Sequence, residues 1–395
     1  MLTDEQIEKL LFKYASRQDE LSLSVIKVIA ERLARIAAFD KLDILEREVT
    51  IRKDIVHIKQ LYNQYVQKQL DSIEEDDWLI ASILYAESAS YYKNPVPLRK
   101  NKELAEKVTE IITQSKKSLQ QLLANPVIVI RDLKNPAVLK ALDFDNCYRS
   151  VINEASSYNN VSSDMRTIAL KRTETQLFDS GVRLMIDNSS DNAKDTTSAN
   201  KAIRMNVLDS MKNLINTMQD VMGKQFGANA VELSAHIYPA PDHAPAQGHQ
   251  FSLEEMEKMQ SGEDFEDLQG NHYIGFERNI GQWNCRHYFM KIKKGAEPEY
   301  TQEQLDKILA DNEKGYTDEN GKHYTLYECT QIQRRYEREI RSAKEKYLYA
   351  KALNDKGLMS KSRNRVGALT TQYKQFSQKC DIPAKMERIK VKDYK

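Results

Sequence analysis

The sequence predicts a mainly α-helical protein with one small α/β (α+β) module, long amphipathic helices and a C-terminal helical hairpin. The first 180 residues contain no glycine. Their apolar residues recur at steps of three and four, which is the period of amphipathic helices. Eight of the 13 glycines and four of the nine prolines then fall between Gly223 and Pro298. Such a concentration of turn-forming residues indicates a segment of short strands and loops.

Residues 1–95 are expected to form an N-terminal helical region. One apolar stripe with helical spacing consists of Ile26, Ile29, Leu33 and Ile36. The segment YYKNPVPLRKN interrupts this pattern, because Pro95 and Pro97 each remove a backbone donor and crowd the preceding turn. The first region is therefore expected to end near residue 95.

Residues 96–223 are expected to be a second helical region, with helices at about 102–123, 136–186 and 201–223. Between the first two helices lies the β-branched run ANPVIVI, which is either a strand or a buried connector. The segment DNSSDNAKDTTSAN is built from small polar side chains. An exposed loop is therefore expected near residues 188–200.

Residues 224–300 are expected to form the small α/β module, rich in glycine and histidine. Segments typical of strands are VELSAHI, HYIGFER and CRHYFMKI, and a Pro-rich loop follows the first of them. A strand at CRHYFMKI would place Cys285 and His287 on one face, because side chains two residues apart on a strand point the same way.

Residues 301–395 are expected to end in a basic antiparallel helical hairpin. Its first helix carries an apolar stripe formed by Ile332, Tyr336, Ile340, Ala343, Tyr347 and Ala350. A turn at residues 354–357 separates it from a second helix that continues to about residue 379. From Gln331 onward 18 Lys and Arg stand against 7 Asp and Glu, a net charge of +11. This charge suits a polyanionic partner or a solvated helical face.

The composition indicates a protein that works in water. Charged residues make up 30% of the chain and the mean hydropathy is −0.65. No apolar run approaches the roughly 20 residues of a membrane span. The N-terminal segment lacks the basic region and cleavage site of a secretory signal, so neither export nor a membrane partner is expected. No C-x-x-C spacing occurs, which favours free thiols at Cys147, Cys285, Cys329 and Cys380.

Five of the seven histidines fall within 52 residues, all in the module: His236, His243, His249, His272 and His287. Imidazole and thiolate are ligands that Zn²⁺ prefers. Candidate ligands of a zinc site are therefore His236, His243, Cys285 and His287. Their spacing matches no specific zinc motif, and histidines that only hydrogen-bond to loop carbonyls are the alternative. No other cofactor is expected.

A catalytic pair of Cys285 and His287 is a further alternative, with His236 or Asp242 as the orienting group. Side chains two residues apart on a strand point in parallel directions. The chain also contains no G-x-S-x-G, H-E-x-x-H or P-loop sequence. We therefore expect that the protein is not an enzyme.

Four blocks occur in order along the last 170 residues: VELSAHIYPAPDHAPAQGHQFSLEE, YIGFERNIGQWNCRHYFMKIKKGAEPEYTQEQL, YTLYECTQIQRRYEREIRSAKEKYLYAKAL and RNRVGALTTQYKQFSQKCDIPAKMERIKV. Together they resemble the phage minor capsid protein 2 family. The upstream segment LKRTETQLFDSG is similar to an R-T-E segment of the related Mu F-like minor head, or head morphogenesis, proteins. The family's recurring signature falls on His236, His243, Gln247, Gly248, Gly281, Trp283, Asn284, Cys285, Arg286 and His287.

The resemblance implies a structural minor head protein of a tailed bacteriophage. Such a protein is expected in the virion, in the head near the portal, after assembly in the host cytoplasm. Its implied partners are the portal protein, other capsid proteins and packaged double-stranded DNA, and a homo-oligomer is an option. It would act in head assembly, DNA packaging or DNA delivery. Long amphipathic helices can lay an apolar stripe on portal helices or on one another.

The basic hairpin offers candidate contacts to DNA or another partner at Arg334, Arg335, Arg338, Arg341, Lys344, Arg363 and Arg365. Side chains that neutralise phosphates give an affinity that ignores sequence and falls with salt. A stand-alone DNA-binding protein is therefore one alternative function. The other is an effector enzyme carried in the head and delivered to the host, by analogy with Mu F-like modules fused to toxin domains.

Overall fold

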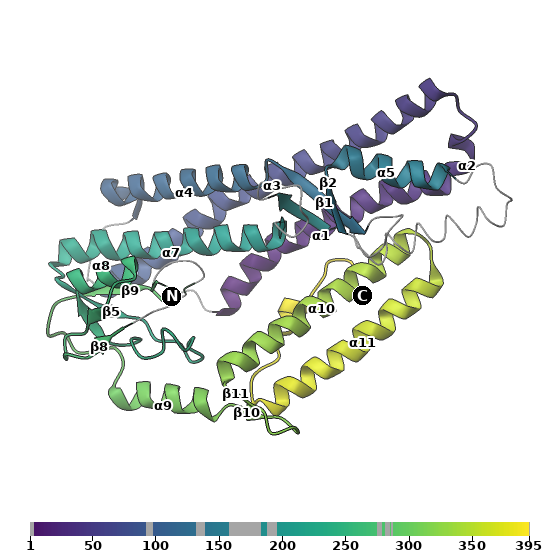
Figure 1. Cartoon of the computed structure of the whole chain (residues 1–395). Helices are drawn as coiled ribbons and strands as arrows, with labels where there is room; N and C mark the ends of the chain where they lie inside the picture. Colours follow the sequence, from purple (N-terminus) through teal and green to yellow (C-terminus); the bar gives the residue numbers. More distant parts are fainter. Residues whose placement is uncertain are drawn as a thin grey trace.

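The computed structural model describes residues 4–91, 98–131, 139–157, 183–187, 196–274, 279–280, 285 and 287–394. These residues form a mainly helical protein with small antiparallel sheets (Figure 1). The predicted fold class is confirmed, since long helices, a small α/β module and a helical hairpin follow one another along the chain. Among the described helices, none combines the length and the apolar character needed to cross a bilayer.

Four long helices that pack against one another build the N-terminal half (Figure 1). They are α1 (Asp4–Ala34), α3 (Ile44–Tyr91), α4 (Lys102–Leu122) and α7 (Ala199–Phe226). The shorter helices are α2 (Ile36–Phe39), η1 (Leu98–Lys100) and α5 (Phe144–Ser156). Helix α3 ends at Tyr91, just before the two prolines. Asn101 and Asp143 cap α4 and α5, because each side chain accepts a hydrogen bond from an amide of the first turn.

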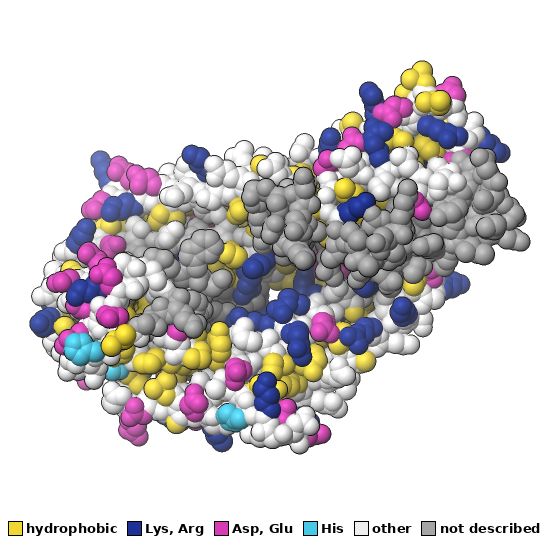
Figure 2. All heavy atoms as spheres, viewed as in Figure 1, with side chains coloured by type: hydrophobic (Ala, Val, Ile, Leu, Met, Phe, Trp, Pro, Cys, Tyr) yellow, Lys and Arg dark blue, Asp and Glu magenta, His cyan; other side chains and the backbone are white. Residues whose placement is uncertain are grey.

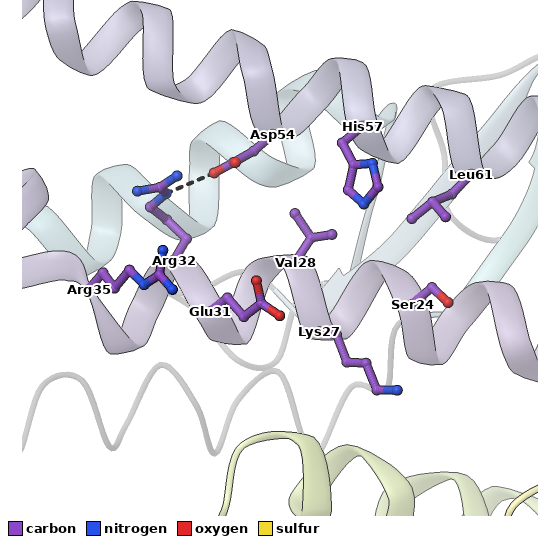
Figure 3. Close-up of a pocket in the computed structure, with 9 residues that line it drawn as sticks. All are labelled: Ser24, Lys27, Val28, Glu31, Arg32, Arg35, Asp54, His57 and Leu61. Atoms are coloured by element: carbon purple, nitrogen blue, oxygen red, sulfur yellow. Dashed lines mark hydrogen bonds and ion pairs between the residues drawn. The ribbon is translucent and has the colours of Figure 1, made fainter.

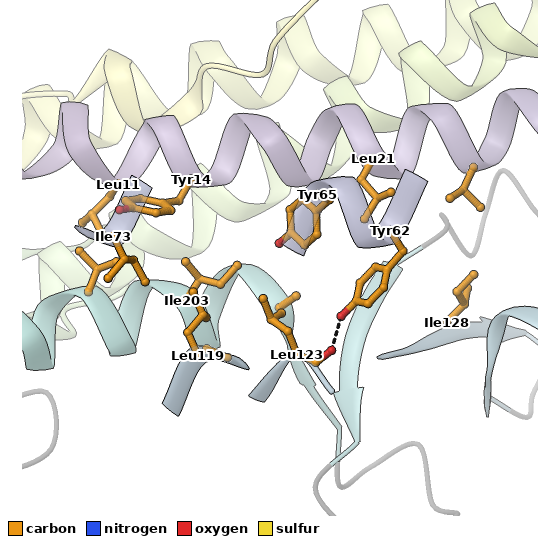
Figure 4. Packing of buried hydrophobic residues seen from close by; sticks show 14 of the residues in the cluster. Leu11, Tyr14, Leu21, Tyr62, Tyr65, Ile73, Leu119, Leu123, Ile128 and Ile203 are labelled. Atoms are coloured by element: carbon orange, nitrogen blue, oxygen red, sulfur yellow. Dashed lines mark hydrogen bonds between the residues drawn. The ribbon is translucent and has the colours of Figure 1, made fainter. Parts of the chain in front are cut away.

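One hydrophobic core joins these helices (Figure 4). The stripe expected near the N-terminus is buried, with at most 5% exposure at Ile26, Ile29, Leu33 and Ile36. Tyr62 of α3 packs against Phe144 with 5.2 Å between ring centroids, and its hydroxyl donates a 2.5 Å hydrogen bond to the carbonyl of Leu123. A buried tyrosine needs such a partner for its hydroxyl. The core therefore ties together segments from both sides of the proline-containing break.

A four-stranded antiparallel sheet in this half was not expected from the sequence. Its order is β2-β1-β3-β4, with β1 (Pro126–Arg131), β2 (Leu139–Leu142), β3 (Arg183–Asp187) and β4 (Thr196–Ser198). The strand alternative for ANPVIVI is confirmed. The helix expected at about 136–186 is wrong at both ends, where β2 and β3 lie, and of the residues described there only α5 is helical. Of the loop expected near 188–200, residues 188–195 lie outside the described residues, and its last residues instead belong to β4 and α7.

Pairing with β1 explains why β2 and β3 are strands where a helix was predicted. The runs LKAL and RLMID are too short to reveal whether their period is that of a helix or a strand. Strand β1 is β-branched and buries Ile128 and Ile130, so its backbone groups need partners on both edges. Ile128 pairs with Leu142 of β2 on one side and with Leu184 of β3 on the other. The segment LKRTETQLFDSG lies outside the described residues.

In the module between residues 224 and 300, the described residues form two small sheets and one helix. Its three-stranded antiparallel sheet has the order β6-β5-β9, with β5 (Ala230–Leu233), β6 (Gln250–Ser252) and β9 (Phe289–Ile292). The other elements are α8 (Leu253–Ser261), β7 (Phe265–Glu266) and β8 (His272–Tyr273). The first and last predicted strands are too long, because residues 241–248 form turns and offer β5 no extended partner beyond Leu233. Cys285 and His287 therefore precede β9, and His236 follows β5.

Gly223 permits close packing of α7 against the module. A Cβ atom at this position would lie 2.5 Å from the Cβ atom of Lys291 in β9, which is well inside van der Waals contact. Lys291 donates its backbone amide to the side chain of Gln219 at 3.2 Å and pairs with Asp220 at 3.1 Å. The last two turns of α7 thus form the platform on which the β6-β5-β9 sheet lies.

The predicted helical hairpin is confirmed (Figure 1). Helix α9 (Gln302–Lys314) and the strands β10 (Tyr316–Thr317) and β11 (His323–Tyr324) lead to α10 (Leu326–Ala352), α11 (Lys356–Lys379) and η3 (Met386–Ile389). Thr325 and Glu328 form a capping box at the start of α10. Asn354 turns the chain with φ of 55°, and Asp355 caps α11. The two helices then enclose their own small core around Ile340, Leu369 and Tyr373.

Candidate metal centre

Two histidines and a cysteine come together where the loop after β5 meets the segment that enters β9. The Sγ atom of Cys285 lies 3.4 Å from Nδ1 of His287 and 3.6 Å from Nδ1 of His243. The possible ligand atoms of all three residues lie within 4.8 Å of one another. Both imidazoles are buried and the thiol is partly buried. This trio is therefore compact enough to share a single small ligand.

His236, the fourth candidate ligand, lies beside this trio. The centroid of its ring is 4.5 Å from that of His287, and the ring of His243 approaches His287 edge-on at 5.4 Å. The backbone amide of His236 donates a 2.9 Å hydrogen bond to Oε1 of Gln247. The structure thus brings all four residues together, and three of them converge through their ligand atoms.

The loop that carries His236 and His243 is held by hydrogen bonds within the module. His243 donates its amide to the carbonyl of Ala240 at 3.0 Å, and Gly248 donates to the carbonyl of Leu233 at 2.8 Å. Gly248 has φ of +74°, a conformation that favours glycine. Of the six further signature residues, the buried Gln247 and Gly248 therefore fix the loop. The others lie outside the described residues: Gly281, Trp283, Asn284 and Arg286.

Two charged groups adjoin the trio. The carboxylate of Asp242 lies 3.6 Å from Nε2 of His243. Lys212 of α7 is close enough to interact electrostatically with Cys285: burial lowers the pKa of its ammonium group, and a Cys285 thiolate would oppose that shift. A neighbouring cation favours the thiolate, which is the form that binds metals and acts as a nucleophile. Sequence reasoning missed Lys212, because nothing local relates it to a cysteine on another element.

The prediction that Cys285 and His287 lie on one strand is wrong, because β9 begins at Phe289. Their side chains are consequently free of the parallel arrangement that a strand imposes, and two imidazole nitrogens lie within 3.6 Å of the sulfur. Chemically, this arrangement can bind a soft or borderline metal ion or activate the thiol.

The two remaining histidines of the module have separate partners. His249 contacts the carboxylate of Asp267 at 2.7 Å, and the hydroxyl of Tyr273 also reaches that carboxylate at 2.8 Å. His272 is exposed and lies 3.2 Å from Glu266. The clustering of histidines in the sequence therefore identified the module, but His249 and His272 do not belong to the group around Cys285.

A surface pocket of about 330 Å³ lies elsewhere, between α1 and α3 (Figure 3). Its wall contains an ion pair between Arg32 and Asp54, at 2.7 Å, and Asp54 also accepts a hydrogen bond from Tyr148. These contacts join α1, α3 and α5. We therefore interpret the charged groups of this pocket as part of the packing of the helices.

The basic hairpin uses several of its candidate contact residues within the chain. Arg341 pairs with the buried Asp19 of α1 at 3.0 Å. Three others contact groups of the C-terminal region: Lys344, Arg363 and Arg365. Arg334 is partly buried, whereas Arg335 and Arg338 are exposed on α10. Lys and Arg side chains gather over this helix on the face shown in Figure 2. Arg335 and Arg338 are therefore the best placed of the candidates to meet a partner.

Comparison with known proteins identifies similarity along nearly the whole chain. The model of the family described as phage minor capsid protein 2 matches residues 2–378. The similarity thus extends beyond the four C-terminal blocks into the N-terminal helices. No curated protein and no solved structure matches the chain.

Proposed function

Because the chain belongs to the phage minor capsid protein 2 family and is a structural protein of the phage head, we propose that it binds the portal and acts in head assembly and in DNA packaging or delivery. As a capsid component it resides in the virion and contacts other capsid proteins. The family is one of structural proteins, so the proposal includes no enzymatic step. The observation that supports portal binding is an exposed apolar row on α3.

This apolar row consists of Leu45, Val49 and Val56, which are 74%, 44% and 53% exposed, and the 88% exposed Ile44 precedes it. Leu45, Val49 and Val56 follow steps of four and seven, so they share one face of the helix. The row begins where α2 joins α3 (Figure 1). Figure 2 shows hydrophobic side chains at this end of the molecule. Single exposed apolar residues are ordinary. A row on one face suits a helix that packs into a groove of a partner.

Portal binding is tested by co-expressing the protein with the portal protein of the same phage and measuring co-elution. We expect the pair to co-elute, and the double substitution Leu45→Ser, Val49→Ser to weaken binding at least about tenfold. Burying two such side chains contributes about 1.5–3 kcal/mol each. Leu79→Ser is the matched control, because Leu79 is 58% exposed on the same helix. Failure of the wild-type pair to associate would refute portal binding, and unchanged binding of the double variant would refute the role of the apolar row.

Contact with packaged DNA is the second candidate, and the exposed arginines of α10 support it. Arg335 and Arg338 are one helical turn apart, within a segment that carries the excess positive charge. Affinity for duplex DNA depends on salt with a logarithmic slope of about −0.9 for each phosphate contact. Charge-neutralising substitutions at this pair should therefore change the slope by a defined amount.

We expect Arg335→Gln, Arg338→Gln to reduce the magnitude of this slope by about 1.8, measured by fluorescence anisotropy with a non-specific duplex. Arg52→Gln is the control, because Arg52 is exposed on α3, outside the basic hairpin. A slope equal to that of the wild type would place any DNA contact elsewhere. Tight DNA binding without portal affinity would instead support the stand-alone DNA-binding alternative.

A further inference from the structure

We propose that His243, Cys285 and His287 bind a zinc ion that fastens the loop after β5 to the segment entering β9, with His236 as the fourth ligand. The proposal does not depend on portal binding. It rests on the separation of the ligand atoms, on the bonding capacity of the sulfur and on the small size of the surrounding core.

The separations between sulfur and nitrogen fit a tetrahedral zinc site. Zinc binds cysteine sulfur at about 2.3 Å and histidine nitrogen at about 2.0–2.1 Å, so tetrahedral angles place the two ligand atoms about 3.6 Å apart. The observed separations are 3.4 Å for His287 and 3.6 Å for His243. Both histidines present the same atom, Nδ1, to the sulfur. Both separations therefore lie within about 0.2 Å of the value that one ion between the three ligands requires.

Hydrogen bonding explains the trio less well than a metal does. A thiol has a single proton and is a weak donor, so it can donate to only one of two imidazoles at a time. The other imidazole would have to donate to sulfur, which is a weak acceptor. A zinc ion instead accepts a lone pair from a thiolate and from both neutral imidazoles.

The groups around the trio suit a closed structural site. The ring of His236 stands 4.5 Å from that of His287 and can supply a fourth nitrogen. Four protein ligands without an open position are characteristic of structural zinc. Asp242 lies 3.6 Å from Nε2 of His243, the nitrogen that remains after Nδ1 binds the ion. At this distance the carboxylate acts on the imidazole through its charge, and approach to hydrogen-bonding distance would orient the ring and increase its basicity.

A zinc ion would add to the stability of the module, because the module's own hydrophobic core is small. Its strands span two to four residues, and its hydrophobic cluster centres on Phe251, Phe265 and Phe289. Small cores bury too little apolar area to be stable without further links. In the sequence, two ligands precede α8 and the other two follow β8, so one ion would join distant parts of the module. The free energy of metal binding would then stabilise its fold.

The test is metal content of the full chain, produced in zinc-supplemented medium and purified without chelators. We expect about one zinc per chain in the wild type. Cys285→Ser and His243→Ala should each retain less than about a tenth of that amount, and His236→Ala should retain zinc but lose it to a weaker chelator. Replacement of zinc by cobalt should produce thiolate-to-metal charge-transfer absorption that Cys285→Ser lacks. The matched control is His272→Ala, which should keep the full amount because His272 is exposed and outside the trio.

Cobalt absorption keeps the test decisive if a variant folds poorly, because it is measured on the wild type. Under-stoichiometric zinc together with no charge-transfer band in the wild type would overturn the proposal. A Cys285→Ser variant that retains one zinc per chain would also overturn it. Metal-free wild type with rapid, selective alkylation of Cys285 would identify the trio as an activated thiol instead.

Discussion

Arg341→Ala is expected to destabilise the protein by about 3–5 kcal/mol and to loosen the C-terminal hairpin from α1. Nη2 of Arg341 lies 3.0 and 3.1 Å from the two carboxylate oxygens of Asp19, and Asp19 is only 5% exposed in its side chain. Burial raises the pKa of the Asp19 carboxyl, and Arg341 opposes that shift. Without the guanidinium group, the buried carboxylate of Asp19 would lose the compensating positive charge that α10 supplies.

Urea unfolding at neutral pH measures this effect, and hydrogen exchange in α10 reports the loosening of the hairpin. Arg365→Ala is the matched control, because Arg365 forms an exposed pair with Glu339 at 3.3 Å on the same hairpin. Such a pair contributes at most about 1 kcal/mol. The double variant Asp19→Asn, Arg341→Met should recover much of the loss, since it removes both charges. Equal destabilisation by Arg341→Ala and Arg365→Ala would show that the contact with Asp19 does not secure the hairpin.

The same contact changes the interpretation of the charge asymmetry. From the sequence, the positive charge of the hairpin suited either an external polyanion or a solvated helical face. The structure places part of this charge against α1, where Arg341 pairs with Asp19 and Lys392 pairs with Glu20. Arg341 also donates to the carbonyl of Lys390. Some of the positive charge therefore attaches the hairpin to the N-terminal helices, whereas Arg335 and Arg338 are exposed on α10.

Local spacing predicted the parts of the fold that depend on local interactions. The stripe from Ile26 to Ile36 and the hairpin turn at Asn354 follow from helical period and turn chemistry. The sheet around β1 could not be predicted, because its strands are joined by pairing between segments far apart in the sequence. A pairing of residues 322 apart, as between Asp19 and Arg341, leaves no local signal either.

The residues of the candidate site could likewise be predicted only where residue type alone identifies them. Residue type alone singled out His243, Cys285 and His287, because imidazole and thiolate share one ligand chemistry. The contribution of Lys212 depends on how α7 packs against the module. The neighbouring thiols of Cys329 and Cys380, whose pKa values burial raises, likewise meet only because α10 and α11 fold back on each other.

Asp77→Asn is expected to stabilise the protein by about 1–3 kcal/mol at neutral pH and to leave it nearly unchanged near pH 4. Burial raises the pKa of Asp77 from 3.8 to about 6; a 2.6 Å hydrogen bond from Ser210 opposes this shift, and the neighbouring Asp76 adds to it. Between these two pKa values the folded state keeps a proton that the unfolded state releases. Stability therefore falls as pH rises from about 4 to about 6, and the penalty persists at higher pH.

Asparagine removes this penalty, because it is uncharged at every pH and its carbonyl oxygen can still accept the hydrogen bond from Ser210. Urea unfolding of both proteins at several pH values between about 4 and 7.5 should show curves that separate as the pH rises. Asp71→Asn is the matched control: Asp71 lies on the same helix but is exposed, and it accepts a surface hydrogen bond from Gln67. If Asp77→Asn and Asp71→Asn respond to pH in the same way, Asp77 is ionised in the folded core without a penalty. A stabilisation confined to Asp77→Asn would instead show that α3 and α7 pack around a carboxyl group that favours its proton.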